Sequence, residues 1–320
     1  MKYLTRLYEL SLSFFRSKIV ILSITFILLA VITFTSVYFV NNHSEEFPQG
    51  YKIISPAIPN QISVFGEGVP LENFEVYERI DRELLVNTYW HSSTILALKR
   101  SSRWFPVIEP ILKEYNIPED FKYLPVIESN LENVVSPAGA TGYWQFVKST
   151  ALQYGLEVNE QVDERYNVEK STIAACKFLL ESYNKFGNWC MAAASYNAGI
   201  NGIEKWSGLQ KTTNYWNLVL GTETSRYVSR IIAMKMIMEN PKEYGYNLKA
   251  EDYYKILKFN EIELNTSVEN FADYAKSIGI NYKTLKYFNP WLRDTGLKNT
   301  EGVIYKIKVP VEGSIKIITE

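Results

Sequence analysis

A helical pattern of apolar residues runs from about residue 75 to about residue 240, and it constrains the fold more than any other feature. Apolar residues recur there at three- and four-residue spacing, and runs with the alternation of strands are absent. Pro241 and Gly245 end the region. Within it, helices are expected at about 148–155, 168–186, 188–197 and 222–239. A domain at 75–245 therefore belongs to the mainly α class.

The block that follows has a different pattern. Residues 253–264 and 303–310 alternate like short strands, and two short helical patterns lie between them at 267–280 and 282–292. The order strand, helix, helix, strand predicts a small α+β module at 250–312.

The N-terminal segment predicts a membrane anchor. Residues 19–40 carry no charge, and as a helix they would span about 33 Å, enough for a hydrocarbon core of about 30 Å. Basic residues precede the run, which places 1–18 in the cytoplasm and the rest of the chain outside, in the periplasm. A cleaved signal peptide is the alternative.

Residues 41–74 are rich in proline and glycine, which argues against regular structure. They also contain several isoleucines, which argues against a freely solvated tether. An extended arm lying on the helical domain fits both facts.

Composition narrows the chemistry. The chain has 34 Lys and Arg against 35 Asp and Glu, a net charge of −1, so nothing favours a nucleic-acid partner. It has only two histidines, His43 and His91, which argues against histidine-based triads and metal sites, and no cofactor is expected. Cys176 and Cys190 are expected to be buried free thiols, because the helical hairpin that carries them holds them too far apart for a disulfide.

Glu128 occupies an unusual place in this pattern. It shares a 3-4-3 spacing with three apolar residues, Phe121, Leu124 and Leu131, so a carboxylate stands on the apolar face of a helix. Desolvation should raise its pKa, which suits a general acid for glycosidic cleavage. The alternative is that the apolar face of this helix lies at other positions, so that Glu128 is a surface glutamate.

Two later segments supply groups that bind sugars. The loop "SPAGATGYWQF" (136–146) combines flexible glycines with aromatic rings and the amide of Gln145. The segment "SYNAG" (195–199) puts Tyr196 and Asn197 in an alanine-rich helix, where their polar groups need partners if buried.

Together with "IES" (127–129), these segments resemble the three ordered motifs of lytic murein transglycosylases with a lysozyme-like fold. Residues 60–310 further resemble the membrane-bound D-type branch, and the tail resembles a degenerate LysM-type module. The resemblance implies cleavage of the β-1,4 bond between N-acetylmuramic acid and N-acetylglucosamine, with 1,6-anhydro ends and a role in cell-wall remodelling.

The same resemblance implies roles for single residues. Glu128 would be the catalytic acid and base, and Ser129 would support the end of its helix. The remaining matched residues would line the sugar cleft: Ser136, Trp144, Gln145, Tyr196, Asn197, Glu223 and Tyr227. The implied partners are peptidoglycan strands and, through 19–40, the membrane, and the chain is expected to be a monomer.

Two alternatives to this function stay open. A hydrolytic muramidase would need a second carboxylate. Glu132 is expected to be solvated, and Asp163 is expected to start a helix or form an ion pair. The other alternative is a non-catalytic protein of the cell envelope that binds peptidoglycan.

Overall fold

The computed structural model describes residues 18, 22, 25–35 and 53–315. The chain divides into two compact units, Met1–Ile54 and Ser55–Glu320. In the first unit, residues 25–35 are helical. No helix among the described residues is both long and apolar enough to cross a membrane. Much of the predicted anchor at 19–40 lies outside those residues.

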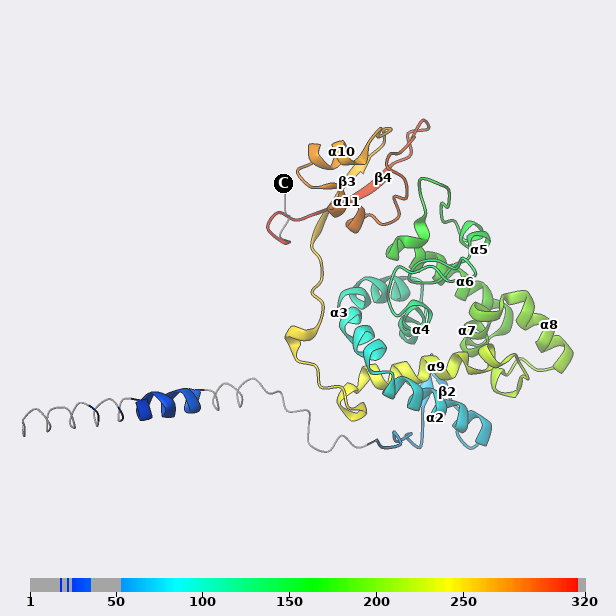
Figure 1. The fold of residues 1–320 in the computed structure, drawn as a ribbon. Coiled ribbons are helices and arrows are strands. Elements are labelled where there is room, and N and C mark those ends of the chain that lie inside the picture. Colours follow the sequence, from blue (N-terminus) through cyan, green and yellow to red (C-terminus); the bar gives the residue numbers. More distant parts are fainter. Residues whose placement is uncertain (1–17, 19–21, 23–24, 36–52, 316–320) are drawn as a thin grey trace, which may run out of the picture. The chain divides into compact units, whose positions relative to one another are not determined.

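The second unit is mainly helical, as predicted (Figure 1). It opens with a short hairpin, β1 (Ser63–Val64) and β2 (Glu67–Gly68). The α-helices that follow are α2 (Phe74–Tyr89), α3 (His91–Glu114), α4 (Leu124–Ser129), α5 (Lys148–Gln153), α6 (Val168–Phe186), α7 (Trp189–Ala198), α8 (Ile200–Gln210) and α9 (Thr222–Glu239). Short 3-10 turns connect them: η1 (Glu119–Tyr123), η2 (Glu164–Tyr166), η3 (Tyr215–Asn217), η4 (Pro241–Tyr244) and η5 (Ala250–Asp252).

Local chemistry explains where several helices begin. The side chains of Asn73, Asn167 and Asn188 accept backbone N–H groups at the starts of α2, α6 and α7. Those N–H groups lack partners inside a helix, so an asparagine at this position stabilises the first turn. Gly187 ends α6 with a φ of 76°, a left-handed conformation that glycine adopts without strain.

One continuous core joins these helices. α2 packs along α9, α6 packs against both α3 and α7, and α7 also contacts α9 (Figure 1). Cys176 and Cys190 are buried and unbridged in this core, as predicted. The segment before α2 packs on the same core, because Phe65 is buried and stacks on Phe121 with ring centroids 4.1 Å apart.

The C-terminal block forms the predicted α+β module. Its elements are β3 (Phe259–Leu264), α10 (Phe271–Ser277), α11 (Tyr282–Phe288) and β4 (Tyr305–Pro310). The two strands pair antiparallel with Ile262 opposite Ile307. The module has its own core, which includes Val162 of the helical domain.

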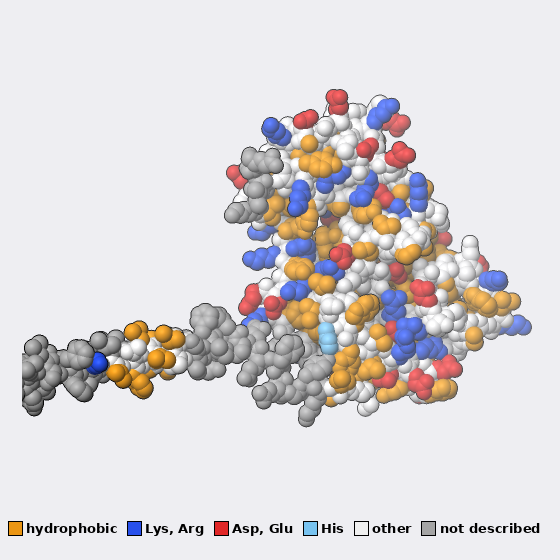
Figure 2. Space-filling model, in the orientation of Figure 1, with side chains coloured by type: hydrophobic (Ala, Val, Ile, Leu, Met, Phe, Trp, Pro, Cys, Tyr) orange, Lys and Arg blue, Asp and Glu red, His pale blue; other side chains and the backbone are white. Residues whose placement is uncertain are grey.

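Backbone contacts hold the module to the helical domain. Val162 and Leu292 form an isolated antiparallel bridge, and the Asp163 N–H donates to the Trp291 carbonyl at 2.9 Å. Lys308 also forms an ion pair with Glu169. On the face in Figure 2, positive and negative side chains are interspersed over this unit, in keeping with the near-zero net charge.

Candidate active site

Glu128 lies near the end of α4, at the border of the core. The helix stops after Ser129 because Asn130 adopts a left-handed φ of 55°. The apolar residues predicted to share the face of Glu128 are all buried: Phe121, Leu124 and Leu131. Glu128 itself is half-buried. Since the chain leaves the helix so soon after it, the carboxyl group faces a hollow instead of the core.

This hollow has a volume of about 280 Å³. Trp90, Ser93 and Thr94 line it from the start of α3, Val134 from the loop after α4, and Arg230 from α9. A second hollow of about 380 Å³ lies between Thr222, Glu223, Arg226 and Arg230. Arg230 therefore lines both hollows.

Two residues of α9 act directly on the carboxyl group. The Tyr227 hydroxyl donates a hydrogen bond to Glu128 Oε1. The Arg230 guanidinium donates to the Ile127 carbonyl at 2.7 Å, which fixes it beside the end of α4. Tyr227 is fully buried, so its ring position is set by packing.

The pKa of Glu128 is raised above its ordinary value. Burial is the largest cause, because it disfavours the charged form, and the negative charge of Glu223 acts in the same direction. The Tyr227 hydrogen bond and the charge of Arg230 oppose the increase. Glu128 therefore keeps its proton at a higher pH than an exposed glutamate does. Tyr227 and Arg230 stabilise the carboxylate once the proton has left.

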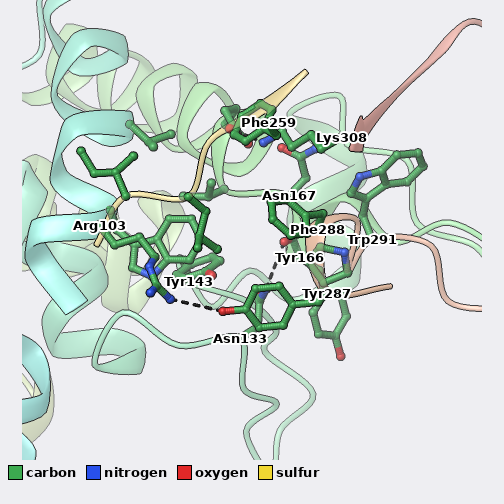
Figure 3. A pocket seen from close by; sticks show the side chains of 17 residues that line it. Arg103, Asn133, Tyr143, Tyr166, Asn167, Phe259, Tyr287, Phe288, Trp291 and Lys308 are labelled. Carbon is green, nitrogen blue, oxygen red and sulfur yellow. Dashed lines mark hydrogen bonds and ion pairs between the residues drawn. The ribbon is translucent and has the colours of Figure 1, made fainter. Parts of the chain in front are cut away.

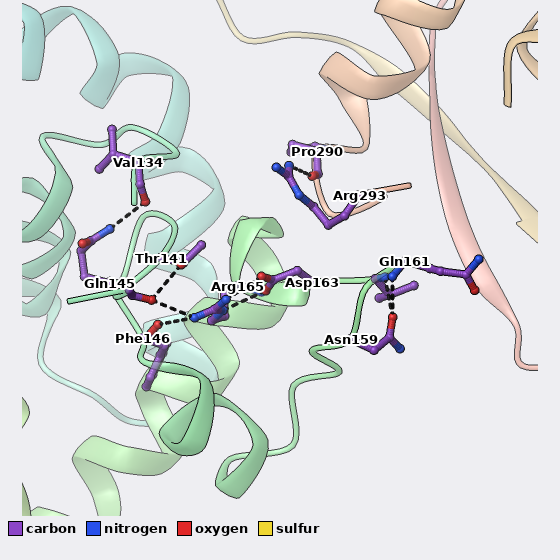
Figure 4. A network of polar contacts seen from close by, with 12 residues as sticks. Val134, Thr141, Gln145, Phe146, Asn159, Gln161, Asp163, Arg165, Pro290 and Arg293 are labelled. Carbon is purple, nitrogen blue, oxygen red and sulfur yellow. Dashed lines mark hydrogen bonds and ion pairs between the residues drawn. The ribbon is translucent and has the colours of Figure 1, made fainter. Parts of the chain in front are cut away.

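The loop after α4 is held by the residues predicted to line the cleft. The Ser136 N–H donates to the Ala140 carbonyl at 2.8 Å, and the Ala140 N–H donates back to Ser136 Oγ at 3.1 Å. Gln145 Nε2 donates to the carbonyls of Val134 at 3.0 Å and Gly142 at 2.8 Å (Figure 4). In the described part of the chain, no hydrogen bond joins Ser136 or Gln145 to Glu128. Both residues instead shape the loop that carries Val134, a wall of the hollow.

Ser129, expected to support the helix end, ties α4 to the same loop. Its hydroxyl is placed to donate to the carbonyls of Pro125 at 3.0 Å and Tyr143 at 2.8 Å. The residue directly after Glu128 is therefore fixed from two sides.

Trp144 corrects an expectation from the sequence. Its side chain is 0% exposed and its Nε1 donates to Thr172 Oγ1 at 2.8 Å. The ring lies in the helical core, where no sugar can reach it. Only its backbone carbonyl takes part in the site, since it accepts the Tyr196 hydroxyl at 2.8 Å.

In the described part of the chain, neither Tyr196 nor Asn197 forms a hydrogen bond with Glu128. Burial is the largest cause of the raised pKa of Tyr196, and the negative charge of Glu128 acts in the same direction. Asn197 Nδ2 donates to Glu223 Oε1 at 3.0 Å, and its Oδ1 accepts the Thr224 hydroxyl at 2.7 Å. Asn197 of "SYNAG" is thus hydrogen-bonded to the start of α9, and Tyr227 of α9 is hydrogen-bonded to Glu128.

Comparison with known proteins identifies the family. Residues 106–219 match the family "Transglycosylase SLT domain". The chain therefore contains a transglycosylase SLT domain. Residues 260–313 match "Soluble lytic transglycosylase C-terminal LysM-like domain", which is the α+β module.

The chain is also similar to two proteins named "Membrane-bound lytic murein transglycosylase D". They come from Escherichia coli strain K12 and Escherichia coli O6:H1, and each is 32% identical over 237 residues. Each comparison covers 72% of this chain and 50% of the relative. The chain therefore spans about half the length of these relatives.

The site uses residues beyond the matched SLT region that sequence reasoning missed. Arg230 follows Tyr227 by three positions on α9, and Trp90 immediately precedes α3. Helical spacing puts Glu223, Tyr227 and Arg230 on one face of α9. This spacing could have predicted that Arg230 belongs to the site. Trp90 had no such signal, because only the tertiary fold brings it to Glu128.

The two other carboxylates considered for the SLT domain are engaged elsewhere. Glu132 is 52% exposed on its side chain and pairs with Arg100 at 3.0 Å, so it is solvated, as expected. Asp163 pairs with Arg165 at 2.7 Å and accepts the Arg165 N–H at the start of η2. Arg165 also donates to the carbonyls of Gly139 and Phe146, both at 3.1 Å, and so connects Asp163 to the loop (Figure 4).

Proposed function

We propose that this chain is a lytic transglycosylase of peptidoglycan, with Glu128 as both acid and base. The observation that carries the proposal is a carboxyl group of raised pKa at the border of a hollow, hydrogen-bonded to Tyr227 and beside Arg230. The SLT domain and the names of the relatives support the substrate, a glycan of alternating N-acetylmuramic acid and N-acetylglucosamine.

In the first step the protonated Glu128 donates its proton to the glycosidic oxygen. The bond from that oxygen to the anomeric carbon of N-acetylmuramic acid then breaks, and positive charge develops on the sugar ring. Glu128 becomes a carboxylate at this moment. The Tyr227 hydroxyl and the Arg230 charge then stabilise the anion, which lowers the barrier to proton transfer.

In the second step the carboxylate of Glu128 takes the proton of the muramyl 6-hydroxyl. The oxygen attacks the anomeric carbon, so an intramolecular bond closes a 1,6-anhydro ring and no water is consumed. Glu128 ends protonated, ready for the next cycle. One carboxyl group suffices, which agrees with the engagement of Glu132 and Asp163 in ion pairs.

A hydrolytic muramidase is the second candidate, and a specific residue favours it. Glu223 lies at the neighbouring hollow, and its negative charge acts on Glu128. Asn197 holds its carboxylate. Glu223 is therefore the group that a hydrolytic reaction would use to activate water.

Product analysis separates these reactions. Murein sacculi are digested with the full-length protein, and the fragments are identified by mass spectrometry. We expect anhydromuramyl ends, their loss in Glu128→Gln and their persistence in Glu223→Gln. The control is Glu132→Gln, which changes a carboxylate four residues further along the chain, outside α4, and should keep full activity.

Other products would point to other functions. Reducing muramic acid ends that disappear in Glu223→Gln would establish hydrolysis instead. Binding to sacculi without any cleavage by the wild-type protein, under conditions where it remains folded, would indicate a non-catalytic protein that binds peptidoglycan.

For the location we propose a membrane-associated protein with its SLT domain in the periplasm. The uncharged run at 19–40 and the word "membrane-bound" in the names of both relatives support this. Extraction of membranes at alkaline pH tests it. The protein should stay in the pellet, and added protease should digest it in spheroplasts but not in intact cells.

A further inference from the structure

The turn η2 and the residues before it lie between the LysM-like module and the loop after α4. On the module side, the Asp163 N–H donates to the Trp291 carbonyl at 2.9 Å. The Arg293 N–H donates to the Gln161 carbonyl at 2.8 Å, and Val162 is buried in the core of the module. The module therefore holds the backbone that leads into η2.

On the other side, Arg165 of η2 holds the loop. Its side chain is 10% exposed, and its Nε and Nη2 donate to the two carboxylate oxygens of Asp163 at 2.9 and 2.7 Å. Nη1 of the same guanidinium donates to the carbonyls of Gly139 and Phe146, both at 3.1 Å (Figure 4). Because a guanidinium is planar and rigid, its bonds to Asp163 determine where these two carbonyls of the loop can lie.

The loop in turn carries a wall of the hollow at Glu128. Val134 lines that hollow, and its carbonyl accepts Gln145 Nε2 at 3.0 Å (Figure 4). The Tyr143 carbonyl accepts the hydroxyl of Ser129, which directly follows Glu128, at 2.8 Å. A shift of the loop would therefore move both the wall of the hollow and the support of the helix end.

A second connection runs through Tyr166, the next residue of η2. The guanidinium of Arg293, which belongs to the module, lies over the Tyr166 ring at 4.0 Å from its centroid. The Tyr166 carbonyl accepts Asn133 Nδ2 at 3.2 Å, and Asn133 directly precedes Val134 (Figure 3). The module thus reaches the same wall by two routes, one through Arg165 and the other through Tyr166.

We propose that the LysM-like module positions the loop beside Glu128 through η2, with Arg165 and Tyr166 as positioning residues. The module holds η2, η2 holds the loop, and the loop holds Val134 at the hollow where the bond is cleaved. This role is separate from any binding of substrate, because every contact in both routes joins two residues of this chain. The inference rests on the proposed function for the reaction that it supports, but not for the connection between module and loop.

Arg293→Ala interrupts the route through Tyr166 at its module end. Arg293 is exposed, and its backbone bond to Gln161 stays in the variant, so the module should remain folded. Arg293→Lys keeps a cation over the ring and should preserve the contact. The matched control is Lys306→Ala, which removes an exposed cation of the same module that pairs with Glu261.

Arg165→Lys interrupts the other route. A lysine keeps the positive charge beside Asp163, but one ammonium group cannot reproduce the planar fork that also reaches the carbonyls of the loop. Thermal unfolding of each variant sets an assay temperature at which all of them are folded, so that a lower stability alone does not change the measured rates.

Hydrogen exchange followed by mass spectrometry reports on the loop in the full-length protein in detergent. Three backbone amides of the loop donate to carbonyls of the same segment: Ser136, Thr141 and Gly142. In Arg293→Ala, exchange over residues 134–146 should become roughly two- to fivefold faster, because one partly exposed cation–π contact is lost. Arg165→Lys should accelerate it more. Lys306→Ala and Arg293→Lys should keep the wild-type rate.

Kinetics on soluble murein glycan strands separate positioning from binding. A positioning role lowers kcat with little change in KM, by roughly two- to fivefold in Arg293→Ala and roughly ten- to hundredfold in Arg165→Lys. A raised KM with the wild-type kcat in Arg293→Ala would show that Arg293 binds strands, and it would overturn the proposal.

Two other results would also overturn it. Exchange of the loop in Arg293→Ala and Arg165→Lys could equal that of the wild-type protein, which would disconnect the module from the loop. Exchange could instead become faster while kcat keeps its wild-type value, which would show that cleavage does not depend on the position of the loop. If the wild-type protein releases no anhydromuramyl ends, the proposed function fails, and the exchange rates still decide whether the module holds the loop.

Discussion

Replacement of Gly142 by alanine tests the geometry of the loop beside the active site. Gly142 has a φ of +83°, and a Cβ there would lie 2.0 Å from the carbonyl oxygen of Arg165 and 2.8 Å from its carbonyl carbon. Both are backbone atoms, which cannot rotate away. The matched control is Gly139→Ala in the same loop, where φ is +79° and a Cβ would meet nothing within 4 Å.

The two variants share one cost and differ in another. A left-handed φ costs a residue with a Cβ about 1–2 kcal/mol, and this applies to both positions. The clash adds about 1–3 kcal/mol at Gly142 alone, as in other overpacked sites. The smaller entropy of the unfolded chain after a glycine-to-alanine change is common to both and cancels in the comparison. Gly142→Ala should therefore be less stable than Gly139→Ala by about 1–3 kcal/mol.

Thermal unfolding followed by circular dichroism measures the difference. One kcal/mol corresponds to about 2–4 °C for a unit of this size, so the two melting temperatures should differ by about 2–12 °C. Gly142→Ala should also lose transglycosylase activity, because Gln145 donates to the Gly142 carbonyl and the displaced segment adjoins Val134. Equal melting temperatures for the two variants would refute the close approach of Gly142 to Arg165.

Two further predictions concern the acid and the core. Activity should fall as the pH rises through the raised pKa of Glu128, because the first step needs the proton of this residue. Glu223→Gln should move this fall in activity to lower pH, because it removes a negative charge that raises the pKa of Glu128. The control is Glu251→Gln, which changes an exposed glutamate and should leave the pH profile of activity unchanged. An unchanged pH profile in Glu223→Gln would contradict the effect of Glu223 on the pKa of Glu128. Thr172→Val should lower the free energy of unfolding by about 1–3 kcal/mol in urea titrations, because it leaves the buried Trp144 Nε1 unpaired. Thr172→Ser keeps the hydroxyl and should lose less, and an equal loss in both would assign the effect to packing.

Local signals in the sequence were sufficient for much of the fold. The predicted helices at 168–186 and 222–239 coincide with α6 and α9, because strong apolar periodicity there agrees with flanking residues such as Asn167 and Gly187. α8 was not predicted, since Gly202 and Gly208 lower the helix propensity of its segment. Burial of Ile203 and Ser207 against the rest of the domain compensates for that deficit.

The site was predictable only in part, for a different reason. The stripe around Glu128 depends on local spacing, so the sequence located the carboxylate and its apolar surroundings. Whether an aromatic residue such as Trp144 faces a cleft or the core depends on contacts far away in the chain, here with Thr172. Periodicity carries no information about such contacts, and the role of Trp90 was missed for the same reason.

After burial, the effects on the pKa of Glu128 all come from one helix. Glu223, Tyr227 and Arg230 all lie on α9, and they act on the carboxyl group in opposite directions. The position of α9 is in turn fixed by its packing along α2. A shift of α9 relative to α4 would change the Tyr227 hydrogen bond and both charge effects together. The pKa of Glu128 therefore depends in part on the α2–α9 packing, and core substitutions that touch no substrate should alter the pH dependence of the reaction.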